Sequence, residues 1–284
     1  MEREAEVTAD ASAATFRAAV IATLTPLPET TPLLLSGGTD SATVLAGLLA
    51  LGRRPDCYTF RLGAHDTADV RVARSMAETF GLRHTIVTIP RNDETLIADV
   101  RRILAITRNP RKVSVQCSHP FLYLAPAIIA DGYQTALTGL GADDRYGTTR
   151  QVAIVCRRGD AAACTAARRA QATRPDASDV AIMATCDHLG LRLLPIFHDD
   201  RLSELLLRMP YAEIHRPVQK GIALRAFPEF WRRGAWYRRN ASLQVASGLR
   251  AWHDTLLRSP ANRRGRRAVA ALYRDLLAEE RGHV

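Results

Sequence analysis

The stretch Leu33-Leu34-Leu35-Ser36-Gly37-Gly38-Thr39-Asp40-Ser41 organises the rest of this chain. A short apolar run ends in a serine and two glycines, and from Ala42 onward the apolar residues follow a helical spacing. This pattern predicts a strand, a glycine loop and a helix. Backbone N–H groups at such a junction point outward together, and the helix N-terminus adds partial positive charge, so the loop favours an anion. Asp40 would repel a bare phosphate, which predicts that Mg²⁺ lies between the two.

A second glycine loop, Gly139-Leu140-Gly141-Ala142-Asp143-Asp144-Arg145-Tyr146-Gly147, follows residues 134–138, which are expected to form another strand. Open parallel sheets bind ligands at the carboxyl ends of their strands. An ordinary turn with solvated acids is the alternative explanation for this loop on its own. Two acidic glycine loops at strand ends together predict that Asp40 and Asp143 converge on Mg²⁺ and a triphosphate.

Strands and helices alternate along the first half of the chain. Further strands are expected at residues 57–60 and 84–89, and helices at 8–24, 66–80, 94–106 and 120–130, with 110–118 irregular. The alternation predicts an α/β fold with a doubly wound parallel sheet. Later helices are expected at 202–208, 220–226, 243–257 and 266–280. We expect one domain over residues 1–284, with a nucleotide-binding core at about 30–150 and an α-rich substrate subdomain at about 151–284 packed on it.

Composition excludes several classes of protein. With 47% hydrophobic and 24% charged residues the chain is of ordinary globular composition, and no apolar run approaches the roughly 20 residues that cross a bilayer. The N-terminal residues lack the pattern of a signal peptide. The five cysteines are odd in number and never spaced C-x-x-C, which predicts reduced thiols, a cytoplasmic location, and neither a zinc ribbon nor an iron–sulfur site.

The net charge of +10 has three explanations. It can reflect a nucleic-acid partner, anionic small substrates, or arginine spread over solvated helices. The basic residues concentrate late in the chain, as in Arg238-Arg239 and Arg263-Arg264-Gly265-Arg266-Arg267. We favour solvated surface plus attraction for a nucleotide, with a tRNA-binding face as the lesser alternative.

The first loop resembles the S-G-G-x-D-S pyrophosphate loop of the N-type ATP pyrophosphatases, or PP-loop enzymes. The second resembles the G-x-G-x-D-E loop of asparagine synthetases and β-lactam synthetases, with Asp144 where those enzymes carry Glu. Residues 194–199, 209–210 and 220–225 are loosely similar to later motifs of these synthetases. The resemblance implies an adenine nucleotide alpha hydrolase-like fold. The chain is expected to be a free-standing synthetase domain, because Glu2 stands where a glutaminase would carry its cysteine.

The resemblance also implies ATP and Mg²⁺ as cofactors. The residues that it assigns to the nucleotide are Leu35, Ser36, Gly37, Gly38, Asp40, Ser41, Phe60, Gly139, Leu140 and Gly141, with Asp40 and Asp143 as the metal ligands. Family enzymes place a late lysine near the α phosphate, but Asn240 stands near that position here. Lys220 is the best remaining cation, with a solvated helix lysine as the alternative. Asp144 and Arg239 complete the candidate catalytic residues.

The leading hypothesis is an AMP-forming ligase that adenylates a small-molecule carboxylate and joins it to an amine or ammonia, in specialised biosynthesis. A tRNA-modifying ATP pyrophosphatase and a non-catalytic nucleotide-binding subunit are the alternatives. The partners expected are therefore small molecules, with nucleic acid less favoured, no membrane, and a homodimer as an option.

Overall fold

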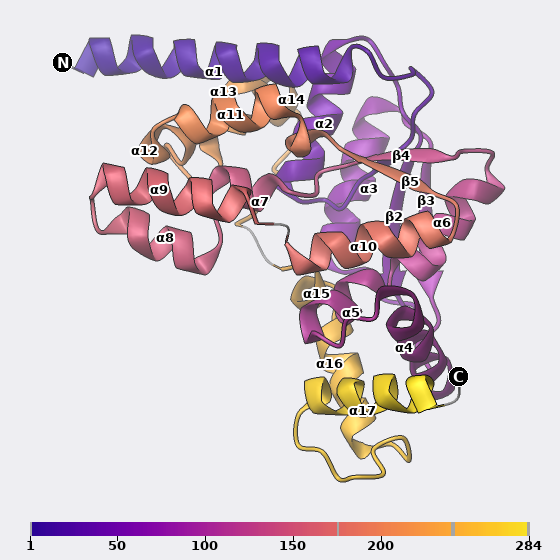
Figure 1. Cartoon of the computed structure of the whole chain (residues 1–284). Coiled ribbons are helices and arrows are strands. Elements are labelled where there is room, and N and C mark those ends of the chain that lie inside the picture. The colour runs from indigo at the N-terminus through magenta and orange to yellow at the C-terminus, as the bar shows by residue number, and fades with distance from the viewer. Residues whose placement is uncertain (1, 175, 240–241, 283–284) are drawn as a thin grey trace.

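A five-stranded parallel sheet forms the centre of the molecule, with strand order β3-β2-β1-β4-β5 (Figure 1). The computed structural model describes residues 2–174, 176–239 and 242–282, with side chains from residue 11 to residue 280 within those ranges. The strands are β1 (Leu33–Leu34), β2 (Cys57–Leu62), β3 (His84–Ile89), β4 (Thr135–Thr138) and β5 (Arg192–Pro195). The predicted doubly wound α/β fold is confirmed.

The strand order places the two glycine loops side by side. Leu33 of β1 pairs with Cys57 of β2 on one side and with Leu137 of β4 on the other. Strands β2 and β3 lie in turn on one side of β1, and β4 and β5 lie in turn on its other side. The carboxyl ends of β1 and β4 are therefore neighbours at the point where the strand order reverses, which is where open α/β sheets bind ligands.

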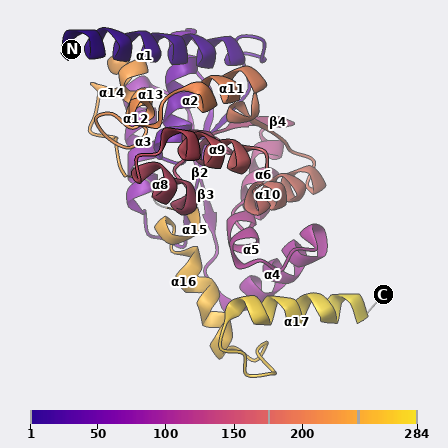
Figure 2. The ribbon, with the colours of Figure 1, turned by 60° about the vertical axis from the view of Figure 1, so that its left-hand side comes forward.

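Helices cover both faces of the sheet (Figures 1 and 2). In the first half they are α1 (Glu2–Leu24), α2 (Thr39–Ala50), α3 (Ala68–Phe80), α4 (Asp93–Thr107), α5 (Lys112–Ser118), α6 (Phe121–Ala130) and α7 (Ala142–Tyr146). In the second half they are α8 (Arg150–Arg157), α9 (Ala161–Ala172), α10 (Ala177–His188), η1 (Ile196–His198), α11 (Asp200–Arg208), α12 (Tyr211–Ile214), α13 (Gly221–Ala226), α14 (Pro228–Trp231), α15 (Leu243–Ala246), α16 (Leu249–Asp254), η2 (Thr255–Arg258) and α17 (Val269–Gly282). Helices α2 and α3 contact one side of the sheet, and α6 and α10 pack together on the other.

The helices from α11 onward pack in two separate places. Helices α11 and α13 lie against the N-terminal helix α1, whose residues Phe16, Val20 and Leu24 are fully buried in the same apolar cluster. Arg17 of α1 also donates to the carbonyl of Ala226 at the end of α13, at 2.9 Å. Helices α16 and α17 instead pack on α4 and α5, at the opposite end of the molecule (Figure 2). Helix α1 thus fixes the position of α13, which begins directly after Lys220.

One stretch expected to be irregular is a helix. Residues 110–118 include α5, in which Ser114, Gln116 and Ser118 are buried together with Val115 and Cys117. The prediction was wrong because polar residues alternate with apolar ones here, and the packing of α5 against α10 buries both kinds. Tertiary burial overrides local preference in so short a segment.

The cysteine prediction is corrected for one pair. Cys156 of α8 and Cys164 of α9 form a disulfide, with Cα atoms 4.4 Å apart. A turn with Gly159 at a φ of 85° folds α8 back on α9, and this brings together two cysteines that their spacing in the sequence did not connect. Cys57, Cys117 and Cys186 are free and buried. This disulfide removes one argument for a cytoplasmic location, which stays a prediction.

One segment has the length and composition of a membrane span, contrary to expectation. Residues 112–130, which comprise α5 and α6, form an apolar stretch of 19 residues. In the fold 67% of its most apolar window is buried inside the protein, as in the core helix of a water-soluble protein. Ala125 and Ile128 of α6, for example, are fully buried in the cluster beneath the sheet.

The contact between α1 and α2 can be tested at Gly47. A methyl group added there would lie 2.7 Å from Leu24 Cδ1 and 2.8 Å from Val20 Cγ1. Helix propensity alone predicts that Gly47→Ala stabilises the protein by about 1 kcal/mol. We expect instead a net loss of about 1–3 kcal/mol in the free energy of unfolding, because α1 must shift. Urea unfolding measures the effect, with Ala50→Ser on the exposed end of α2 as the control; a gain in stability for Gly47→Ala would show that α1 does not pack there.

Candidate active site

The first glycine loop has a conformation held by its own hydroxyl groups. Ser36 N donates to Ser41 Oγ at 3.1 Å, the two serine hydroxyls lie 2.9 Å apart, and Ser41 Oγ donates to Gly38 O at 3.2 Å. Gly37 has a φ of 76°, and a Cβ there would lie 2.2 Å from the carbonyl oxygen of Asp69. Only glycine fits this position, so the loop is a preformed turn leading into the N-terminus of α2.

The second loop lies directly against the first. Gly139 follows β4, and a Cβ added to it would come 2.8 Å from Ser41 N and 2.9 Å from Asp40 Cβ. Leu140 N donates to the hydroxyl of Thr138 at 3.3 Å, which bends the chain toward α7. The absence of a side chain at Gly139 therefore allows Asp40 and Asp143 to approach each other from two different strands.

Lys220 joins these two carboxylates. Its Nζ lies 2.8 and 2.7 Å from the two oxygens of Asp40 and 2.7 Å from Asp143 Oδ1. The lysine side chain is only 2% exposed, whereas the side chains of Asp40 and Asp143 are 20% and 48% exposed. The ring of Tyr146 lies 5.4 Å from the ammonium. The solvated-helix alternative for Lys220 is thereby excluded.

His215, which the sequence did not point to, holds Lys220 in place. The Lys220 backbone N–H donates to His215 Nδ1, and His215 Nε2 lies 3.0 Å from the carbonyl of Tyr146, to which it donates. Lys220 has a φ of 59°, in the left-handed region that residues other than glycine seldom adopt. Burial lowers the pKa of His215 to about 4, so the ring is neutral and can accept at Nδ1.

The two aspartates affect the pKa of Lys220, and Lys220 and Asp143 affect the pKa of Asp40. Burial would lower the pKa of the Lys220 ammonium, but the two carboxylates outweigh it and raise that pKa, so the lysine is charged. Burial raises the pKa of Asp40 to about 6, against the opposing effect of Lys220 and with a contribution from Asp143. With a pKa of about 6, Asp40 is mostly anionic at neutral pH.

The two carboxylates fit a divalent cation only together with a ligand. Both carboxylates contact Lys220 Nζ, so their oxygens lie close enough together to share one cation. Among the described side chains no group of three acids, histidines or cysteines could form a complete metal cage. Mg²⁺ bound by one or two carboxylates normally takes its other ligands from water and phosphate oxygens, so Asp40 and Asp143 suit a metal that arrives with a triphosphate.

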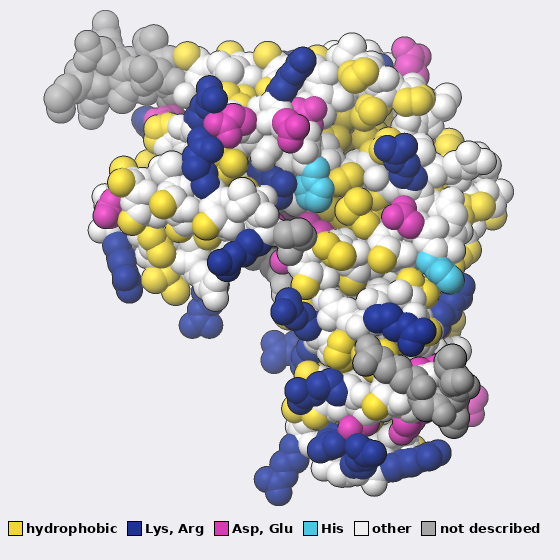
Figure 3. Space-filling view, in the orientation of Figure 1, with side chains coloured by type: hydrophobic (Ala, Val, Ile, Leu, Met, Phe, Trp, Pro, Cys, Tyr) yellow, Lys and Arg dark blue, Asp and Glu magenta, His cyan; other side chains and the backbone are white. Residues whose placement is uncertain are grey.

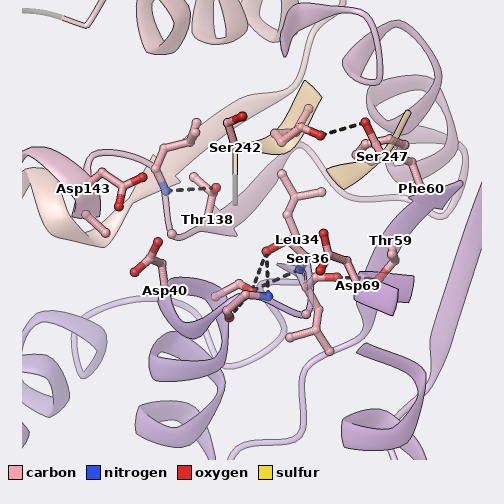
Figure 4. A pocket seen from close by; sticks show the side chains of 18 of the residues that line it. Leu34, Ser36, Asp40, Thr59, Phe60, Asp69, Thr138, Asp143, Ser242 and Ser247 are labelled. Atoms are coloured by element: carbon pink, nitrogen blue, oxygen red, sulfur yellow. Dashed lines mark hydrogen bonds between the residues drawn. The ribbon is translucent and has the colours of Figure 1, made fainter. Parts of the chain in front are cut away.

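A cavity of about 360 Å³ opens beside the two loops (Figure 4). Leu34, Thr59 and Phe60 of β1 and β2 contribute one wall, and Ser242 and Ser247 contribute another, as the figure shows. The predicted residues that line it are Leu35, Ser36, Gly37, Gly38, Asp40, Ser41, Phe60, Gly139, Leu140, Gly141, Asp143, Asp144 and Arg239. Lys220 is not among the lining residues and faces the cavity through the carboxylates that it contacts.

Asp144 and Arg239 line the cavity away from Lys220. Asp144 is 5% exposed and accepts from Gln171 Nε2 at 3.0 Å, and burial raises its pKa to about 6. Arg239 is exposed at the cavity edge, next to Arg238, which pairs with Asp69. Asn240, the residue near the expected family lysine, lies outside the described residues.

Sequence reasoning missed a second group of acids in the cavity. Asp176 and Asp179, in the first turn of α10, line the cavity near Asp144, and burial followed by repulsion from these neighbours raises the pKa of Asp179 to about 7. Asp176 accepts from the backbone of Ser178 and is the N-cap of α10. Nothing local in the sequence indicated that the start of α10 faces the cavity.

Comparison with known proteins identifies the region that holds both loops. The profile of the family described as asparagine synthase matches residues 29–177. A 7-cyano-7-deazaguanine synthase of Paramagnetospirillum magneticum is 47% identical over 58 residues, which are 20% of this chain and only 26% of that protein. A solved U34-tRNA thiolase of Methanococcus maripaludis, with its 4Fe-4S cluster, has 15% identity and a TM-score of 0.32 over 93% of this chain and 78% of its own. At this TM-score and identity, the likeness to the thiolase carries no functional meaning.

The link between Lys220 and Asp40 can be tested without any substrate. We expect Lys220→Met to lower the free energy of unfolding by about 2–3 kcal/mol, because it leaves a largely buried carboxylate without its cation. Adding Asp40→Asn should restore most of this loss, since the unpaired charge is then removed. Urea unfolding of the two single variants and the double variant measures the coupling. Strictly additive effects would contradict the pairing.

Proposed function

Because this chain belongs to the asparagine synthase family, whose PP-loop domains use ATP, we propose that it is an AMP-forming ligase that adenylates a small-molecule carboxylate. The observation that carries the proposal is the meeting of Asp40, Asp143 and Lys220 beside a preformed glycine loop and a cavity. A strand-end loop that offers backbone N–H groups suits the pyrophosphate part of ATP. The apolar wall at Leu34 and Phe60 suits the adenine ring.

In the proposed site each residue has a limited task. Ser36, Gly37, Gly38 and Ser41 bind the β and γ phosphates through backbone and hydroxyl donors. Asp40 and Asp143 would hold Mg²⁺, which would supply neutralisation of the triphosphate charge. Lys220 is a positioning residue: it orients both carboxylates and lowers the negative charge that they present to the phosphates.

The proposed reaction has two steps. A carboxylate oxygen of the substrate attacks the α phosphorus, the bond from that phosphorus to the bridging oxygen breaks, and pyrophosphate leaves. An amine or ammonia nitrogen then attacks the carbonyl carbon of the acyl-adenylate, AMP leaves, and the nitrogen loses a proton to give an amide. The acids at Asp144, Asp176 and Asp179 line the cavity and can bind an amine or receive that proton.

The first prediction for this function concerns products and metal ligands. We expect ATP to be converted to AMP and pyrophosphate, and we expect Asp40→Asn and Asp143→Asn each to abolish this turnover while the protein stays folded. Isotope exchange between ATP and pyrophosphate, run with a panel of carboxylic acids, measures adenylation directly. Phosphorus NMR identifies the products, and circular dichroism monitors the fold.

Each other outcome of this experiment has a distinct meaning. ADP and phosphate as the only products would rule out cleavage between the α and β phosphates. Exchange that requires tRNA in place of a carboxylic acid would favour a tRNA-modifying ATP pyrophosphatase. ATP binding without exchange under any condition would favour a non-catalytic nucleotide-binding subunit. Near-normal turnover in either asparagine variant would show that the carboxylates are not metal ligands.

The second prediction concerns Lys220 and pH. We expect Lys220→Ala to lower kcat by roughly a hundredfold, about 3 kcal/mol, while the affinity for ATP changes less because the glycine loops still hold the phosphates. The wild-type rate should fall below about pH 6, as Asp40 gains a proton and loses its affinity for the cation. Lys220 lowers the pKa of Asp40, so in Lys220→Ala this acid limb should move to higher pH. An unchanged pH profile would assign Lys220 a purely structural role.

A further inference from the structure

Three helices form a continuous surface at the mouth of the cavity. The first turn of α10 and the helix α15 both contribute residues to the cavity lining. Helix α5 contacts both of them, because Ser114 Oγ donates to Ala177 O at 2.9 Å and Cys117 Sγ donates to Gln244 Oε1 at 3.4 Å. We call α5, the first turn of α10, α15 and residues 249–280 the rim surface.

The rim surface exposes apolar side chains. Val113 of α5, Val180 of α10 and Val245 of α15 are 46%, 52% and 52% exposed. They are three of the four large hydrophobic residues that are exposed in the described part of the chain, and the fourth, Ile154, lies on α8. Three contacting helices thus each expose one valine, and we call these three valines the apolar patch.

The same surface carries an excess of arginine. Residues 242–280 contain seven arginines and four acids, and each acid already has a cation: Asp254 pairs with Lys112, Asp275 with Arg264 and Arg266, and Glu279 and Glu280 with Arg101. Five exposed arginines of the segment form no ion pair with any described residue: Arg250, Arg258, Arg263, Arg267 and Arg274. Lys and Arg side chains accordingly gather over the end of the molecule that holds α16 and α17 (Figure 3).

The arginine-rich loop before α17 has a defined shape. Asn262 Nδ2 donates to Leu257 O at 2.8 Å and to Arg266 O at 3.0 Å, and Arg266 N donates back to Asn262 Oδ1 at 2.7 Å. Asp275 holds the Arg266 side chain at 2.6 and 2.9 Å. The neighbouring Arg263 and Arg267 are therefore presented from a structured loop, which lowers the entropic cost of binding a partner.

We propose that the rim surface, which runs from the cavity-lining helices α10 and α15 to the far end of the molecule, is a docking site for an acidic protein. Arginine around a small apolar patch is the composition of a protein–protein interface, and the unpaired arginines require acidic groups opposite. A second copy of this chain does not fit, because it carries the same charge of +10. Single-stranded RNA is held by exposed aromatic rings, and membrane-surface helices by exposed Trp, Phe or Leu; no such residue is exposed in the described ranges.

The test uses defined probes without ATP, so its failure is distinct from failure of the proposed ligase. Fluorescence anisotropy compares an acidic amphipathic helical peptide of Glu and Leu, polyglutamate of equal charge, oligouridylate of equal charge, and the same peptide competed by phosphatidylglycerol vesicles. We expect the amphipathic peptide to bind more tightly than polyglutamate or oligouridylate, and more weakly as salt rises. Arg250→Gln, Arg258→Gln, Arg263→Gln and Arg267→Gln combined should weaken its binding by about tenfold or more.

Two further variants separate the apolar patch from general charge. Val113→Thr, Val180→Thr and Val245→Thr combined should reduce binding of the amphipathic peptide severalfold and leave polyglutamate unchanged. A control with four exposed arginines changed to Gln elsewhere, at Arg192, Arg201, Arg232 and Arg233, should bind the peptide within twofold of the wild type. The proposal is overturned if oligouridylate or the vesicles bind more tightly than the peptide, if the control loses as much affinity as the rim variant, or if the peptide does not bind.

Discussion

The ion pairs of Lys220 with Asp40 and Asp143 are the interaction on which the rest of the structure depends. The lysine is 180 residues away from Asp40 in the chain, and the ammonium is almost completely buried. Removing one partner of such a buried ion pair leaves an uncompensated charge that water solvates poorly. The arrangement therefore requires that the loop after β1, the loop after β4 and the turn before α13 meet within hydrogen-bonding distance of one atom.

Several residues and helices that carry none of these three charges hold the charged side chains together. Gly139 lets the two loops touch, and His215 supports Lys220 in a left-handed conformation from behind. Helix α1 packs on both α13 and α2, so the N-terminal helix positions Lys220, which directly precedes α13. A charged site is thus assembled by apolar packing of helices that carry none of its charges.

The second half of the chain divides its tasks between two lobes. Helices α11 to α14 complete the core beneath Lys220, whereas α15 to α17 form the far lobe, one end of which lines the cavity. The acids of the far lobe pair with cations of α4, α5 and the lobe itself, and its remaining arginines are exposed. The positive charge of the far lobe therefore attracts anionic molecules that approach the protein. The acids at Asp144, Asp176 and Asp179 instead attract cationic groups of a molecule bound in the cavity.

The sequence by itself determined β1 to β4, most helices and both glycine loops but not β5, because strand alternation, helix caps such as Gly81 and close-approach glycines are local signals. It also indicated Asp40 and Asp143, whose loops follow predicted strands, whereas the strand order of the structure is what makes those strands neighbours. Only the tertiary structure decided that Lys220 joins them, that His215 supports it, that α5 is a helix and that Cys156 meets Cys164. These features depend on packing between segments distant in the chain or on burial, and no local pattern of residue types encodes such contacts.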